Sequence, residues 1–127
     1  MSGRVSIEIA GFAHANPVPA ACRIGPFLFT GVLTGRDPVT TQMPASLEAQ
    51  CANVFAHMRE VVAAVDGSTD DIAKITFWVA DYRDRDALNR EWLRMFPDAA
   101  SRPARQVMAA TLDGGALIHA DLIAVLD

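Results

Sequence analysis

The spacing of hydrophobic residues along the chain predicts two amphipathic helices. Between residues 47 and 65 the apolar positions recur at intervals of three and four, the periodicity of one helix face. Ser46 is a favourable N-cap before this segment, and Gly67 lies where glycine commonly ends a helix. A second segment with this periodicity runs from about residue 85 to 96, and Pro97 stops it.

Alternating and β-branched segments predict about six strands. The predicted strands are residues 4–10, 21–24, 27–33, 72–80, 104–112 and 116–126. Gly25-Pro26 predicts a hairpin between the second and third strands, and Asp113-Gly114-Gly115 predicts another between the last two. Residues 11–20, which include two prolines, and the polar residues 34–43 are predicted to be loops.

The order of these elements predicts the fold class. A strand and a hairpin are followed by a helix, a strand, a second helix and a last hairpin. This order favours a two-layer α+β domain, with an approximately six-stranded mixed sheet and both helices on one face. A chain of 127 residues is long enough for one hydrophobic core and too short for two, so residues 1–127 are predicted to form a single domain.

The last predicted strand indicates what lies on the other face of the sheet. One of its faces is entirely apolar and suits the helix layer: Ile118, Ala120, Leu122, Ala124 and Leu126. The opposite face mixes polar and apolar residues: Leu117, His119, Asp121, Ile123 and Val125. Such a face is too apolar for water and too polar for a dry core, so we expect another subunit to cover it.

Composition narrows the class of protein. Apolar residues make up 51% of the chain and charged residues 20%, a globular balance. The net charge of −4 argues against a dedicated nucleic-acid binder, which usually carries a basic excess. No apolar run is long enough to span a membrane, and the N-terminal residues do not resemble a signal peptide. We therefore expect a cytoplasmic protein.

Cysteine and histidine residues do not indicate a metal site. Cys22 and Cys51 are far apart and are expected to be small buried hydrophobic residues. His14, His57 and His119 are widely scattered, so no third or fourth zinc ligand is visible.

Arg105 and His119 are the candidate catalytic residues of the two last strands. The planar guanidinium of Arg105 suits a carboxylate, and the alternative is an ion pair with an acidic side chain or a helix C-terminus. With a three-residue turn, Arg105 would pair with Ile123 and His119 with Ala109. Both side chains would then share a face, roughly 13 Å apart along the backbone. A two-residue turn would shift this register, and the alternative role of His119 is that of an interface histidine.

Three further residues are weaker candidates. Asn89 lies in the first turn of the second helix, where most asparagines are solvated or cap the helix. Thr30-Gly31 ends a strand and offers backbone amides, although a glycine there commonly marks only a bend.

Several segments together resemble the RidA/YjgF/UK114 family of enamine and imine deaminases. The resemblance covers residues 20 to 126. It is carried by GPFLFTGVLTGRDP, EAQCANVFAHM, DDIAKITFWVADYRDRDALNREW and RPARQVMAATLDGGALIHADLIAV. It implies a chorismate-mutase-like fold and a homotrimer with sites between subunits. It also implies hydrolysis of 2-imino or 2-enamino acids, such as 2-aminoacrylate, to 2-keto acids and ammonia without a cofactor.

The resemblance also implies roles for individual residues. The family arginine that holds the substrate carboxylate matches Arg105, the pocket-lining strand end matches Thr30 and Gly31, and the helix asparagine matches Asn89. Two features depart from the family. His119 stands where typical deaminases have a glutamate that activates water, and residues 16–19 lack the tyrosine of the family's early loop.

These departures leave competing hypotheses for the function. The first is a deaminase in which neutral His119 accepts the proton of the attacking water. The second is a non-catalytic or regulatory trimer that binds small carboxylates, and a related alternative is a different carboxylate substrate. The third, a ribonuclease, is opposed by the acidic composition.

Overall fold

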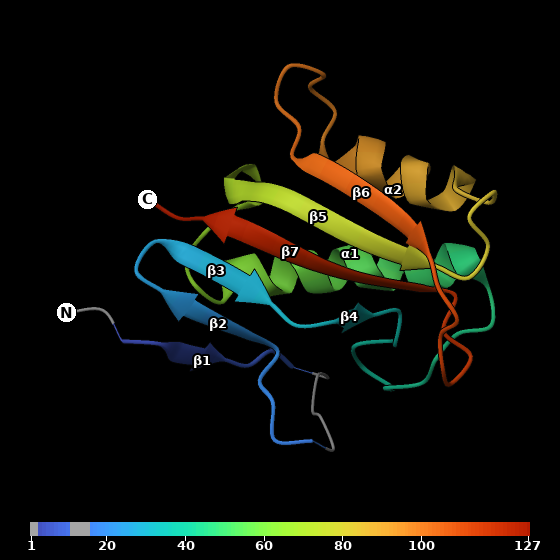
Figure 1. The fold of residues 1–127 in the computed structure, drawn as a ribbon, viewed down its shortest axis with the longest axis horizontal. Coiled ribbons are helices and arrows are strands. Elements are labelled where there is room, and N and C mark those ends of the chain that lie inside the picture. Colours follow the sequence, from blue (N-terminus) through green and yellow to red (C-terminus); the bar gives the residue numbers. More distant parts are fainter. Residues whose placement is uncertain (1–2, 11–15) are drawn as a thin grey trace.

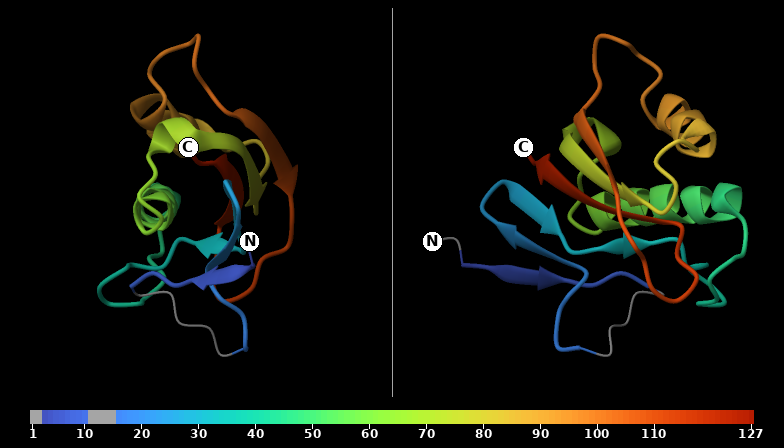
Figure 2. Two further views of the ribbon diagram at one scale, coloured as in Figure 1. Left: turned by 90° about the vertical axis from the view of Figure 1, so that its left-hand side faces the viewer. Right: turned by 45° about the vertical axis from the view of Figure 1, so that its right-hand side comes forward.

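Within the described residues, 3–10 and 16–127, two α-helices cover one face of a seven-stranded sheet in the computed structural model (Figure 1). The strands are β1 (Val5–Ile7), β2 (Ala21–Ile24), β3 (Phe27–Thr30), β4 (Leu33–Thr34), β5 (Ile72–Val79), β6 (Ala104–Ala109) and β7 (Ile118–Val125). The α-helices are α1 (Leu47–Ala63) and α2 (Asp86–Met95), and a short 3-10 helix, η1 (Thr69–Asp71), precedes β5. Both α-helices lie on the same side of the sheet (Figure 2). The predicted two-layer α+β architecture is confirmed.

Both ends of α1 lie close to their predicted positions. The Ser46 hydroxyl accepts a hydrogen bond from the backbone N–H of Ala49 at 3.1 Å and so caps the helix. At the other end the left-handed residue is Asp66, with φ of 58°, rather than Gly67. Glycine is favoured at position 67 because a larger residue would not fit: its Cβ atom would lie 2.8 Å from Leu126 Cδ2.

The strands are joined in the order β1-β2-β3-β7-β5-β6, and β4 also pairs with β7. Neighbouring strands are antiparallel except for β5 and β6, which are parallel and are connected through α2. A parallel pair needs such a crossover connection, and the helix of the crossover covers the sheet. Phe77 of β5 stacks on Phe55 of α1 with ring centroids 5.8 Å apart, at the centre of the core.

The predicted hairpin between residues 104–112 and 116–126 is wrong, because β5 lies between β6 and β7. The turn itself exists, and Gly114 and Gly115 adopt the positive φ values of 66° and 78° that favour glycine. However, the connection passes around the end of β5. Ala110 N–H donates to the Val79 carbonyl, and Ala80 N–H donates to the Leu117 carbonyl.

Burial explains why β6 is displaced to the edge. Every second residue of β7 is buried against the helices, whereas β6 contains no buried residue. A strand with a continuous apolar face is stabilised more at the centre of a sheet, where both of its neighbours and the helices cover it. Strand β6, which carries Arg105 and Gln106 and has no buried residue, is better placed at the edge, and the parallel crossover puts it there.

Two other strands differ from their predicted bounds. The first strand, predicted at residues 4–10, is limited to the three residues of β1. The predicted strand 27–33 is split into β3 and β4, because one extra residue interrupts the pairing with β7 between Phe29 and Leu33. Residues 11–15 of the predicted loop 11–20, which include His14, lie outside the described residues.

The face of the sheet away from the helices, here called the open face, carries many apolar side chains. By strand register it includes Cys22, Ile24, Phe27, Phe29, Lys74, Thr76, Trp78, Gln106, Met108, His119, Asp121, Ile123 and Val125. Phe27, Phe29 and Val125 are each at least 40% exposed. The predicted division of β7 is confirmed, since its apolar face is buried and its mixed face is not. None of the helices described is long and apolar enough to cross a membrane.

Candidate active site

Arg105 lies on the edge strand β6, on the face that the helices cover. It pairs with Ile75 of β5, and paired residues of neighbouring strands point to the same side of the sheet. Its guanidinium carbon lies 5.1 Å from the ring centroid of Trp92 on α2 and 5.9 Å from that of Phe77. The cation therefore rests on aromatic faces between the edge strand and α2.

No carboxylate among the described residues pairs with Arg105. The ion pair found in this part of the chain is the one between Arg94 and Glu91. Partial burial lowers the pKa of Arg105, and the positive charge of Arg85 lowers it further. The alternative of a structural ion pair is therefore wrong within the described residues, where Arg105 is a partly buried cation with no acidic partner.

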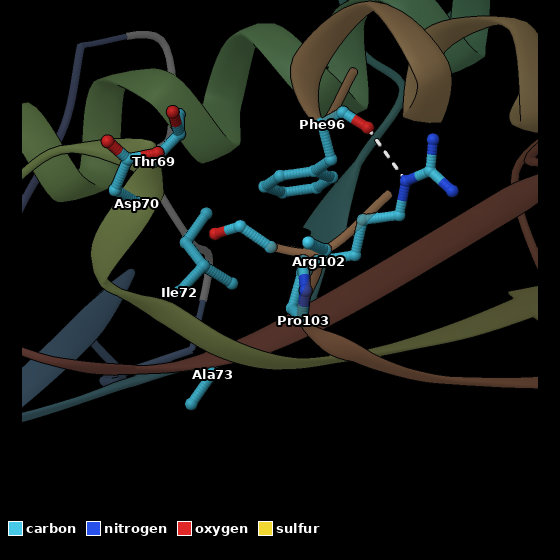
Figure 3. A pocket seen from close by; sticks show the side chains of 9 residues that line it. Thr69, Asp70, Ile72, Ala73, Phe96, Arg102 and Pro103 are labelled. Carbon is cyan, nitrogen blue, oxygen red and sulfur yellow. Dashed lines mark hydrogen bonds between the residues drawn. The ribbon is translucent and has the colours of Figure 1, made fainter. Parts of the chain in front are cut away.

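The Trp92 ring beneath Arg105 packs against the residue that follows the end of α2. Phe96 packs edge-on against Trp92 with ring centroids 4.8 Å apart. Arg102 Nε donates to the Phe96 carbonyl at 2.9 Å, and Arg102 Nη2 lies 3.4 Å from the Pro97 carbonyl (Figure 3). The two arginines flanking Pro103-Ala104 thus differ in role. Arg102 binds the carbonyls of the two residues that follow α2, whereas the side chain of Arg105 has no hydrogen bond with the other described residues.

A hollow of about 250 Å³ lies beside Arg102, between the start of β5 and the segment that leads into β6. Thr69, Asp70, Ile72, Ala73, Phe96, Ala100, Ser101, Arg102 and Pro103 line it (Figure 3). Arg105 does not line this hollow, and the guanidinium of Arg102 is already engaged with the backbone. It is therefore separate from the candidate active site.

Asn89 lies on the side of α2 that also carries Trp92, the residue beneath Arg105. It is exposed and lies three residues before Trp92, so both residues share one side of the helix. The Asn89 backbone N–H donates to the Arg85 carbonyl at 2.9 Å, which is a regular helical bond. Its side-chain amide has no hydrogen bond with the other residues described, so it neither caps the helix nor ties two segments together.

Thr30 and Gly31 lie at the interruption between β3 and β4. The Thr30 hydroxyl accepts a hydrogen bond from the Leu122 backbone N–H at 2.9 Å, which compensates for the broken pairing with β7. The Gly31 N–H donates to the Ala20 carbonyl at 2.9 Å. The expectation that Gly31 offers a free backbone amide is therefore wrong, although its exposed Cα leaves space beside it.

His119 lies on the open face of β7 and is half-buried. It pairs with Trp78 of β5 on one side and with Thr34 of β4 on the other. Burial lowers the pKa of His119, and the negative charge of Asp113 partly opposes that change. The imidazole is therefore neutral at neutral pH, as a proton acceptor must be.

Arg105 and His119 do not share a face in one chain. The expected pairings of Arg105 with Ile123 and of His119 with Ala109 are wrong, because both strands pair with β5 instead. The structure brings Arg105 together with α2, which carries Asn89, and leaves His119 on the opposite side of the sheet. Sequence analysis also missed Trp92 as the support of Arg105, since its spacing indicated only a core position.

The described residues contain no group of three or more His, Cys, Asp or Glu side chains suited to a metal ion. Cys51 is fully buried, and burial raises its pKa to about 12, so it is an inert core residue as predicted. Cys22 differs from prediction, because it is only half-buried and lies on the open face. The arrangement around Arg105 suits binding of a small acid by a cation and an amide.

Known proteins resemble this chain over nearly its whole length. The profile of the endoribonuclease L-PSP family matches residues 6–126. A RutC family protein of Haemophilus influenzae is 30% identical over 121 residues, which cover 84% of this chain and 92% of the relative.

Solved structures share the fold over almost the whole chain. The Rid-family protein YyfA of Yersinia pestis is 22% identical with a TM-score of 0.89, covering 98% of this chain and 100% of that one. E. coli TdcF, solved with bound serine, is 24% identical with a TM-score of 0.87, covering 97% of this chain and 99% of that one. From the profile match and the H. influenzae relative, this chain belongs to the endoribonuclease L-PSP family, the RidA/YjgF/UK114 family that its sequence resembles.

Proposed function

We propose that this protein binds a small 2-imino or 2-enamino acid through Arg105 and hydrolyses it to a 2-keto acid and ammonia. The observation that carries the proposal is the Arg105 guanidinium, which has no acidic partner among residues 3–10 and 16–127 and is held over Trp92 in a partly buried position. A guanidinium binds a carboxylate through two parallel hydrogen bonds, and partial burial strengthens them. Asn89 supplies a further amide on the adjacent helix.

The relatives support a small acid as the ligand. TdcF was solved with bound serine, a molecule with one carboxylate and one amine on the same carbon. A 2-imino acid has its carboxylate and nitrogen in the same relation. Family membership is consistent with imine chemistry, so we assign Arg105 the carboxylate of the substrate.

The proposed reaction needs one water molecule and proton transfers. Water adds to the C=N carbon while its proton passes to a base, and the electron pair of the double bond moves to nitrogen, which takes up a proton. The resulting carbinolamine then loses ammonia, and its oxygen forms the carbonyl of the 2-keto acid. His119, which is neutral because burial lowers its pKa, is the proposed proton acceptor.

The proposed site requires two copies of the chain. Arg105 and His119 lie on opposite faces of one sheet, so a single small substrate cannot touch both in one subunit. We infer a homotrimer in which the open face of one subunit lies against the β6 edge of the next. This arrangement covers the exposed Phe27, Phe29 and Val125 and brings His119 of one copy toward Arg105 of another.

A second candidate function is a trimer that binds small acids without catalysis. The replacement of the family glutamate by His119 favours it, since an imidazole carries no negative charge beside the imine. The two functions are separated by a coupled assay in which a dehydratase generates 2-aminoacrylate. A deaminase increases the rate of pyruvate formation, whereas a binding protein leaves the background rate unchanged.

The test of the shared carboxylate site is Arg105→Ala. We expect loss of at least tenfold in affinity for 2-oxobutanoate by calorimetry, because a charge-assisted pair in a partly buried site contributes about 2 to 5 kcal/mol. Arg105→Lys should recover little of the lost affinity, because an ammonium group lacks the two parallel N–H donors of a guanidinium. The control is Arg59→Ala, which removes an exposed arginine of α1. Unchanged affinity in Arg105→Ala would show that Arg105 does not hold the carboxylate.

A further inference from the structure

A second arginine, Arg85, occupies an electrostatically unfavourable position at the start of α2. It is the N-cap residue of that helix, and its side chain does not cap the backbone. Aspartate, asparagine, serine and threonine are preferred at this position, and a positive charge there is repelled by the helix dipole. A residue that breaks a local rule without stabilising the helix is a candidate for a functional role.

Arg85 is held in place by an aromatic ring and not by an acid. Its guanidinium carbon lies 4.6 Å from the ring centroid of Tyr82, and the side chain is half-buried. Asp84 and Asp86 flank it in sequence, yet neither forms an ion pair with it among the described residues. Its donors are therefore oriented but not used within the described part of the chain.

Arg85 lies on the same side of α2 as the candidate active site. Residues 85, 89 and 92 are separated by four and three positions, so they follow one line along the helix. Trp92, at the end of this line, carries the Arg105 guanidinium. The positive charge of Arg85 also contributes to the lowered pKa of Arg105, which places both cations within electrostatic reach of one another.

Arg85 and Arg105 are both half-buried beside α2, and each rests on an aromatic ring. Their positive charges repel one another when no anion is bound. A ligand with two negative groups removes this repulsion and uses both guanidinium forks. Arg85 and Trp92 are seven positions apart, on the order of 10 Å along the helix axis. A ligand that reaches both cations therefore has its acidic groups several bonds apart.

We propose that Arg85 is a specificity-determining residue that binds a second carboxylate, so that the substrate class is an elongated 2-imino dicarboxylic acid. This inference rests on the proposed function, because it assigns the first carboxylate to Arg105. Asn89 lies between the two arginines along α2 and is positioned to contact the middle of such a ligand. The hydrolysis product is the corresponding 2-keto dicarboxylic acid, and water supplies its new carbonyl oxygen.

The experiment compares 2-keto acids with one and two carboxylates on the intact protein. Affinities for 2-oxobutanoate, 2-oxoglutarate and 2-oxoadipate are measured by calorimetry for the native protein and for Arg85→Ala, Arg105→Ala and Arg90→Ala. Arg90→Ala is the matched control, because Arg90 is an exposed arginine on another side of the same helix. Thermal unfolding of each variant is recorded in parallel, and Arg85→Gln is included as a polar replacement.

We expect the native protein to bind at least one dicarboxylate about tenfold more tightly than 2-oxobutanoate, as one additional charge-assisted hydrogen bond provides. Arg85→Ala and Arg85→Gln should remove that advantage, weaken 2-oxobutanoate binding much less than dicarboxylate binding, and not lower the melting temperature. Arg105→Ala should weaken all three ligands.

Other results overturn the inference or its basis separately. Equal native affinities for mono- and dicarboxylates, or an equal loss for both in Arg85→Ala, contradict the role of Arg85 and leave that of Arg105 intact. A lower melting temperature in both Arg85 variants with unchanged dicarboxylate preference shows that Arg85 is structural. Unchanged binding in Arg105→Ala, or no binding of any ligand to the native protein, contradicts the proposed function as well.

Discussion

At the scale of single residues, the proposed proton transfer depends on the charge state of His119. Its pKa is lowered by burial, and the opposing charge of Asp113 does not cancel that effect. The ordinary histidine pKa is near 6.5, so a lowered value keeps the ring neutral at and below neutral pH. If His119 accepts the proton of water, activity should persist into mildly acidic solution. It should be lost only when the pH falls below the ordinary histidine pKa.

The prediction for His119 combines substitution with a pH profile. Native turnover of 2-aminoacrylate should be constant from pH 8.5 to about 6.5 and should fall at lower pH. His119→Ala should lower kcat by about a hundredfold with little change in KM, as expected for lost base catalysis. His119→Glu should restore activity, since glutamate occupies this position in typical deaminases. Equal rates for all three proteins at every pH would exclude His119 from the reaction.

Part of the site could be predicted from the sequence. Alternation within β7 correctly divided buried residues from His119 and Asp121, because strand side chains strictly alternate. The relation of Arg105 to His119 could not be predicted, since it depends on which strand lies between them. The proximity of Arg105 to Trp92 likewise depends on the parallel pairing with β5, which has no local signal in either segment.

At the scale of elements, Gln50 of α1 joins the helix to the loop that precedes it and to the distant turn before β7. It is fully buried, and its amide donates to the carbonyls of Pro44 and Gly115 at 2.7 and 3.0 Å. Its oxygen accepts from the Leu117 N–H at 2.7 Å. The turn that leads into β7 is therefore fixed to α1, which substitutes for the contacts of the hairpin that does not form.

Gly35 makes this arrangement sensitive to a single methyl group. A Cβ atom on Gly35 would lie 2.6 Å from Gln50 Cβ and 2.9 Å from its Cα. Gly35→Ala should therefore reduce the free energy of unfolding by about 1–3 kcal/mol, because α1 must shift. Gly31→Ala is the control, since its added atom meets only ordinary contacts at 3.6 Å and beyond. Chemical denaturation measures the stability of both variants. Equal midpoints would show that α1 can shift without a loss of stability.

The bounds of the helices were easier to predict than the pairing of the strands. The helices were found within one or two residues, because apolar periodicity and the signals at Ser46 and Pro97 are local. Asp113-Gly114-Gly115 correctly indicated a tight turn but not the partners of the strands that it joins. Burial favoured β7 at the centre of the sheet and β6 at its edge, and this long-range preference overrode the local hairpin signal.

At the scale of the whole molecule, the open face is the main unpartnered surface of the described chain. It presents Phe27, Phe29 and Val125 beside the polar His119 and Asp121. Burial raises the pKa of Asp121, and the charge of Lys74 opposes this. Covering this face removes apolar area from water, at roughly 25 cal/mol per Å².

We expect a trimer of about three times 13.7 kDa by light scattering at micromolar concentration. Phe29→Asp should dissociate it, because an unpaired carboxylate would be buried at the interface. Val39→Asp is the control, since Val39 is 87% exposed and lies outside the sheet. A monomeric native protein, or a Phe29→Asp variant that retains the trimer mass, would contradict the proposed use of the open face.

The two tryptophans of the chain lie on opposite faces of the sheet, and this gives the protein two separate optical reporters. Trp92 lies beneath the Arg105 cation, whereas Trp78 pairs with His119 on the open face. In a Trp78→Phe variant the remaining indole emission follows occupancy beside α2. In a Trp92→Phe variant it follows contact between subunits. The proposed ligand binding and the proposed assembly are thereby testable independently by fluorescence, without an attached label.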